Sequence, residues 1–153
     1  MRQQKKETLA TILSLVITCP VFAGHHEDSN VAEIKAVHKE YVDDVVKRNF
    51  NAIASHFQAP VMHRSAQGIM VSDTTEEIAQ RFKEFMANIQ DGYKYSIIDR
   101  LDVTKIADSL YYADYSRFNS KDEVLYQGRS IYFFSDTDGA WRMFATEREK
   151  GKK

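Results

Sequence analysis

The sequence predicts an α+β fold, in which a curved antiparallel sheet packs on N-terminal helices. In the first half of the chain, apolar residues recur at three- and four-residue spacing, which is typical of amphipathic helices. After residue 92 the period changes to two, and aromatic and β-branched residues become frequent, as in strands. Because helices come first and strands follow, one domain over residues 30–149 is expected.

The first helix is predicted to begin at Asn30. Asn30 is a suitable N-cap, and Glu33 stands three residues later, where its side chain can reach back to the cap. The apolar residues that follow share one helical face: Val31, Ile34, Val37, Tyr41 and Val45.

A second, short helix is predicted from the spacing of Phe50, Ile53 and Phe57, ending before Pro60 because proline disfavours helix in the residue before it. Residues 61–71 contain Gly68 and no helical period, which predicts a short strand or a hairpin.

A third helix is predicted to follow a second capping box, in which Thr74 is the cap and Glu77 stands three residues later. It should stop before the turn sequence at Asp91 and Gly92. Its apolar stripe consists of Ile78, Phe82, Phe85, Met86 and Ile89.

Four antiparallel strands complete the prediction: residues 93–104, 110–118, 124–134 and 141–146, with turns at 119–123 and 136–139. The third of these strands is apolar on both faces, since Tyr132 and Phe134 alternate with Ile131 and Phe133. One face should meet the helices, and the other predicts a homodimer through the outer face of the sheet.

The first 23 residues read as a secretory signal peptide. A basic segment precedes an apolar run from Leu9 to Phe22, and Ala23 closes a sequence that a signal peptidase accepts. The protein is therefore expected to be periplasmic or secreted, with no membrane attachment after cleavage. An uncleaved anchor and lipidation at Cys19 are the alternatives.

Cleavage after Ala23 would remove Cys19, the single cysteine, so the mature chain would hold no disulfide. It would also remove three basic residues and one acidic residue, which changes the net charge from −1 to about −3 (−1 − 3 + 1). A negative net charge argues against nucleic acid as a partner.

The mature chain would then begin at Gly24, with residues 24–29 as a flexible N-terminus. The free amine, two backbone nitrogens and the imidazole of His26 would surround Cu(II) or Ni(II) in a square plane. No other cofactor is expected.

The order of these elements, together with the closing sequences at residues 128–132 and 138–143, resembles the nuclear transport factor 2-like superfamily, which includes SnoaL-like cyclases and ketosteroid isomerases. The resemblance covers residues 33–143 and implies a cone-shaped sheet with a pocket for a small apolar molecule at its wide end. Many members are dimers.

The isomerases of this superfamily use a tyrosine and two aspartates. Tyr41 falls on the tyrosine position, whereas the base position falls within His63, Arg64 and Ser65, and the acid position falls on or beside Tyr132. The isomerase carboxylates are therefore not present at the matching positions.

The function expected from the resemblance is binding of a small apolar molecule by Tyr41, His63, Tyr132 and Phe144. An isomerase, cyclase or dehydratase acting on a carbonyl-bearing apolar substrate is the alternative, with His63 as the base and Tyr41 and Tyr132 as oxyanion donors. A structural or accessory dimer subunit is the third reading.

Overall fold

The computed structural model describes residues 29–105, 109–136 and 138–149. The predicted signal peptide, residues 24–28 and His26 with them lie outside this range. Within it, no helix is long and apolar enough to cross a membrane. The elements are α1 (Ser29–Lys47), α2 (Phe50–Ser55), β1 (Phe57–Ser65), β2 (Gly68–Ser72), α3 (Thr75–Ala87), β3 (Tyr93–Lys105), β4 (Ser109–Asn119), β5 (Val124–Asp136) and β6 (Trp141–Arg148).

The helices begin close to where the sequence predicts. α1 starts at Ser29, one residue before the predicted cap Asn30. At α3, Thr74 Oγ1 accepts a hydrogen bond from the backbone N–H of Glu77 at 3.2 Å, and Glu77 Oε2 accepts one from the N–H of Asp73 at 2.8 Å. These bonds satisfy two backbone donors, which confirms the predicted start of the third helix.

α2 ends earlier than predicted, at Ser55 rather than just before Pro60. The backbone leaves the helix because it joins the sheet: the N–H of Met143 donates to the carbonyl of His56 at 2.9 Å, and Phe57 pairs with Met143. Pairing with the last strand thus takes precedence over the local helical spacing.

The sheet has six strands in the order β2-β1-β6-β5-β4-β3. The hairpin predicted at residues 61–71 is confirmed as β1 and β2, and the four predicted strands of the second half are confirmed as β3 to β6. The sheet is mixed rather than wholly antiparallel, because β1 runs parallel to β6 while every other pair is antiparallel. This parallel pair joins segments far apart in the chain, and local periodicity carries no sign of it.

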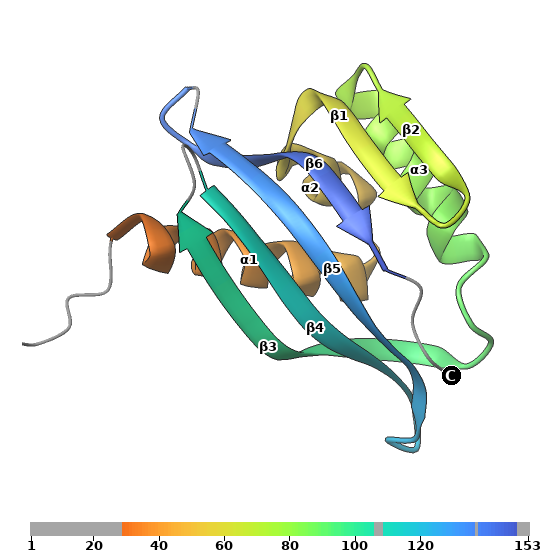
Figure 1. Ribbon diagram of the computed structural model, residues 1–153. Coiled ribbons are helices and arrows are strands. Elements are labelled where there is room, and N and C mark those ends of the chain that lie inside the picture. The colour runs from red at the N-terminus through yellow and green to blue at the C-terminus, as the bar shows by residue number, and fades with distance from the viewer. Residues whose placement is uncertain (1–28, 106–108, 137, 150–153) are drawn as a thin grey trace, which may run out of the picture.

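The helices cover one face of the curved sheet, hereafter the inner face: α1 crosses β3 to β5, and α2 and α3 lie against the β1–β2 side (Figure 1). Between them lies the core, whose larger fully buried apolar side chains are Ile34, Ile53, Val61, Ile78, Phe134 and Met143. The α+β class with helices packed on a curved sheet is thereby confirmed.

The opposite, outer face carries a charged network. Asp114 alternates with the buried Ala113 and Tyr115 and therefore points outward. Its carboxylate accepts from Arg129 Nε at 2.7 Å and lies 3.2 Å from Arg100 Nε. The homodimer predicted through this face stays a prediction.

Candidate functional site

A cavity of about 130 Å³ opens on the inner face, between α1 and α3 on one side and β1, β5 and β6 on the other. Its aromatic lining consists of Tyr41, Phe57, Phe82, Phe85 and Tyr132. Its polar and charged lining includes His63, Arg64, Arg81, Ser130, Thr146, Glu147 and Arg148. The cavity is therefore mostly apolar, with polar groups concentrated on β1 and β6.

The aromatic rings contact one another mainly edge to face. Tyr41 comes from α1, and its ring centroid lies 5.7 Å from that of Phe57 and 5.9 Å from that of Tyr132. Phe82 and Phe85 stand three residues apart on α3, a spacing that brings both to one side of the helix. Edge-to-face packing of this kind holds rings in fixed orientations.

The two tyrosines form a hydrogen-bonded pair, because the hydroxyl of Tyr41 bonds to that of Tyr132. Burial raises the pKa of both phenols above their usual value, that of Tyr41 by more. Both are therefore neutral at physiological pH. Beneath them, the buried His38 of α1 packs edge-on against Tyr132, with the ring centroids 5.0 Å apart.

His63 lies at the β1 side of the cavity, and its Nδ1 is 2.9 Å from Thr146 Oγ1 on β6. Burial lowers the pKa of His63 to about 4, with further lowering by the positive charges of Arg81 and Arg148. The imidazole is therefore neutral at pH 7, and it is a weak base.

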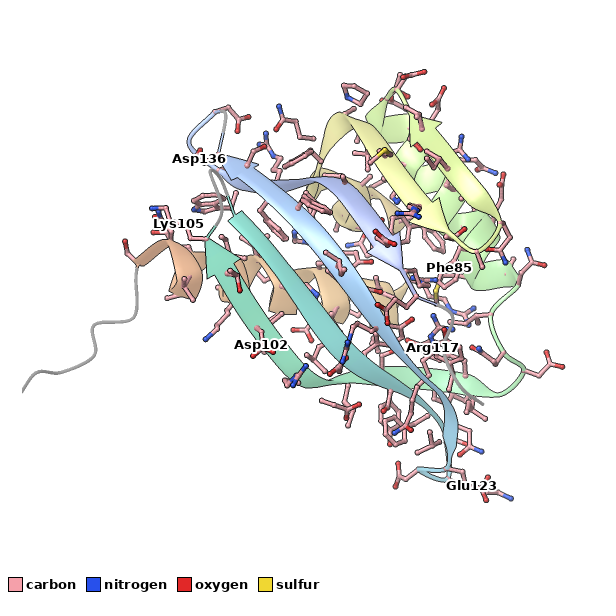
Figure 2. All side chains as sticks on the ribbon, in the orientation of Figure 1. Phe85, Asp102, Lys105, Arg117, Glu123 and Asp136 are labelled. Carbon is pink, nitrogen blue, oxygen red and sulfur yellow. The ribbon has the colours of Figure 1, made fainter. Side chains whose placement is uncertain are left out.

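Two arginines flank Phe85, which is one of the residues that line the cavity. The Cζ of Arg148 lies 4.5 Å from the centroid of the Phe85 ring, and that of Arg117 lies 5.4 Å from it. Figure 2 shows Phe85 and Arg117 near each other where α3 ends. Contacts of this length stabilise a guanidinium through the negative face of the ring.

A second, smaller cavity of about 50 Å³ adjoins the first, and Arg148 lines both. Arg117 lines the smaller one and donates from Nη1 to Gln90 Oε1 at 2.8 Å. Burial lowers the pKa of Arg117. For Arg148, burial also acts to lower the pKa, but four tyrosine side chains, Tyr115, Tyr132, Tyr41 and Tyr126, together act in the opposite direction, and the pKa is raised.

The structure brings Tyr41, His63 and Tyr132 together in the lining of the main cavity and places Phe144 elsewhere. Phe144 packs against Phe133 at a centroid distance of 6.0 Å and borders a separate, shallow depression. The cause is a β-bulge in β6: Phe133 pairs with Ala145 and Phe134 with Met143, so Phe144 is the extra residue. Placing Phe144 in the pocket with the other three was therefore incorrect.

Sequence reasoning missed Arg148 because the last strand was predicted to end at Thr146, whereas β6 continues to Arg148. Strict alternation along β6 puts Phe144, Thr146 and Arg148 on one face, whereas the bulge separates Phe144 from the other two. Phe82 and Phe85 were recognised only as an apolar stripe, and a stripe does not show which of its members border a cavity.

The isomerase carboxylates are absent from the cavity as the structure describes it. Among the described lining residues, Glu147 alone carries a carboxylate, and it lies 3.4 Å from Arg64 Nη1. No group of three or more histidine, cysteine, aspartate or glutamate side chains in the described ranges is arranged to hold a metal ion. The Cu(II) or Ni(II) prediction concerns His26, outside those ranges.

Comparison with known protein families assigns most of the chain: the family model described as "NTF2-like protein (DUF6841)" matches residues 32–150. No curated protein matches the sequence.

Solved structures share the fold at low sequence identity. A protein of unknown function with a cystatin-like fold from Nostoc punctiforme superposes with a TM-score of 0.69 at 13% identity, covering 82% of this chain and 93% of that one. Aln2 from a Streptomyces species gives 0.66 at 17% identity, covering 81% and 92%. An NTF2-like protein of unknown function from Pseudomonas putida gives 0.64 at 13% identity, covering 79% and 86%. At these identities the likeness concerns the fold alone.

Proposed function

The chain belongs to the NTF2-like protein (DUF6841) family, and on that premise we propose that it binds a small, largely apolar molecule in the cavity between α1, α3 and the sheet. The observation that carries the proposal is the ring of five aromatic side chains around about 130 Å³ of open space. Protein interiors are otherwise packed without voids of this size, and apolar clefts with a few polar groups are typical ligand sites.

Tyr41, His63 and Tyr132 are the proposed ligand contacts. His63 and Thr146 supply polar groups on β1 and β6, and Tyr132 on β5 is the cross-strand neighbour of Thr146, so its hydroxyl and that of Tyr41 add donors to the lining. Because all of these groups are neutral at pH 7, they suit the uncharged part of a ligand.

An enzymatic role is the second candidate, since a histidine and two tyrosine hydroxyls share one cavity. Two features favour binding over catalysis. A base with a pKa of about 4 is poorly matched to proton abstraction at neutral pH. The tyrosine hydroxyls are bonded to each other, so one of the two donors is already used.

The proposal extends to export through the signal peptide at residues 1–23. N-terminal sequencing of the protein recovered from its natural compartment tests it: a mature chain starting at Gly24 is expected, and an intact Met1 in a cytoplasmic fraction would contradict it.

Binding is tested with fluorobenzene, a neutral single-ring probe, followed by ¹⁹F NMR on the purified mature protein. Saturable binding is expected for the natural sequence. Thr146→Leu adds bulk inside the cavity and should weaken binding strongly, whereas Thr104→Leu, on the exposed part of β3, should leave it unchanged. Equal binding by both variants, or no saturable binding at all, would contradict the proposal.

A further inference from the structure

We infer that the ligand of this cavity is an anion, a carboxylate carried on a single planar ring, and that Arg148 binds the carboxylate. The inference rests on the proposed binding function and names the chemical class of its ligand.

Arg148 and Arg117 carry positive charges that no described carboxylate neutralises. In the part of the chain that the structure describes, neither Arg148 nor Arg117 forms an ion pair with a carboxylate, and the charge of Arg148 adds to burial in lowering the pKa of Arg117. A buried cation without a counter-ion is costly. An anionic ligand would supply the missing charge, and a guanidinium offers a planar pair of donors that fits a carboxylate.

The hydroxyl of Tyr115 is available to a ligand. Tyr115 is 7% exposed, and its hydroxyl is buried without a hydrogen-bond partner among the described residues. Tyr115 and Arg148 line the smaller cavity together, and Arg148 also lines the main one. The smaller cavity thus offers two kinds of donor, and no acceptor from the described residues is bonded to the Tyr115 hydroxyl. A carboxylate, which only accepts hydrogen bonds, is the complementary group.

The volume of the main cavity fits a single ring. An engineered cavity of about 150 Å³ in another protein accommodates benzene, so about 130 Å³ suits one ring rather than a fused system. Phe57 and Phe82, whose ring centroids are 5.5 Å apart, both line the cavity that such a ring would fill. Arg81 also lines the cavity and donates from Nη2 to the carbonyl of Val71 at 2.8 Å, and its positive charge attracts anions to the cavity.

A packing role is the competing explanation, because Arg148 covers the ring of Phe85 and its aliphatic stem buries apolar surface. A methionine would fill the same space without a charge. The two explanations therefore predict different results for Arg148→Met. Only the ligand role requires that the preference for an anionic over a neutral ligand depends on Arg148.

The test compares benzoate with benzamide, its neutral planar counterpart, by isothermal titration calorimetry on the mature protein. The natural sequence should bind benzoate at least about tenfold more tightly, as expected for a hydrogen-bonded charge pair. Arg148→Met should bring the ratio close to one while benzamide still binds. Arg142→Met, on the same strand but paired with Asp138 at the surface, should keep the tenfold ratio.

Arg148→Lys guards against a variant that fails to fold, since it retains the charge and should keep part of the preference for benzoate. Equal affinity for benzoate and benzamide in the natural sequence, or an undiminished ratio in folded Arg148→Met, would overturn the inference. If fluorobenzene still bound in either case, the proposed binding function would stand. Failure of all three probes would overturn both.

Discussion

The two faces of the sheet use arginine in opposite ways. On the outer face, Arg129 and Arg100 both reach the carboxylate of Asp114, at 2.7 and 3.2 Å. On the inner face, Arg148 and Arg117 contact aromatic rings, and neither pairs with a described carboxylate. Arginine is thus paired with a carboxylate on the outer face, where water is available. On the inner face, where water is scarce, it has no described counter-ion.

This difference indicates separate roles for the outer and the inner arginines. Exposed ion pairs contribute little to stability, and substitution there should be tolerated. Unpaired interior cations lower stability in the free protein, and such strain is typical of functional sites. This difference agrees with the inference that Arg148 binds a ligand, whereas the outer arginines belong to the solvated surface.

The largest expected effect concerns packing on the two faces. Phe134 is fully buried on the inner face, whereas Phe144 lies beside Phe133 on the outer side of the bulge. Phe134→Ala should lower the free energy of unfolding by about 3–5 kcal/mol because it leaves a cavity in the core. Phe144→Ala should cost about 1 kcal/mol.

Urea denaturation followed by circular dichroism measures both variants. Similar losses for the two would mean that the outer face is packed as tightly as the inner one, which a second copy of the chain on that face would explain.

As the pH falls, the inner face should lose its contribution to the free energy of unfolding before the outer face does. Burial lowers the pKa of His38 to about 4, and that of His63 to about 4 as well. Unfolded histidines titrate near 6.5, so the unfolded chain binds more protons between pH 6.5 and 4, and the free energy of unfolding falls as the pH falls through that window. For His38 the loss is on the order of 3 kcal/mol at pH 4.

His38→Leu should flatten this part of the stability profile, measured by urea denaturation at several pH values. The hydrogen bond from Arg129 lowers the pKa of Asp114, so the contribution of the outer network should persist until the pH falls below about 4. An unchanged slope in His38→Leu would show that the inner histidine is not the group that titrates.

The sequence predicts the aromatic part of the site much better than its charged part. Tyr41 follows from the helical spacing, and its place beside Tyr132 follows from the family resemblance. Arg148 does not, because the last strand was predicted to end at Thr146 and β6 continues to Arg148. The extra residue at Phe144 turns Phe144 itself away from the cavity. The parallel pairing of β1 with β6, which brings His63 to Thr146, is a long-range contact without a local sequence signature.

A smaller effect is expected from removing the inner charge itself. Arg117→Met replaces an interior guanidinium, stacked at 4.6 Å over Tyr126, by an apolar side chain. Stability without ligand should stay the same or rise by about 1–2 kcal/mol, as replacement of buried charge by apolar groups often gives. Arg129→Met on the outer face should lower it slightly.

Thermal unfolding followed by calorimetry compares the two variants under identical buffer conditions, without carboxylate or phosphate. A clear loss of stability in Arg117→Met would show that the stacked cation is itself a structural element and would weaken the contrast between the faces.

The smallest effect belongs to the outer network. Asp114→Asn removes the charge that Arg129 and Arg100 share, and the free energy of unfolding should fall by less than about 1 kcal/mol because these side chains are partly exposed. The difference between variant and natural sequence should shrink further in 1 M NaCl, where the Debye length is about 3 Å. A loss that is large and independent of salt would mean that Asp114 also neutralises the interior arginines through the sheet, and the two faces would then have to be treated as one electrostatic unit.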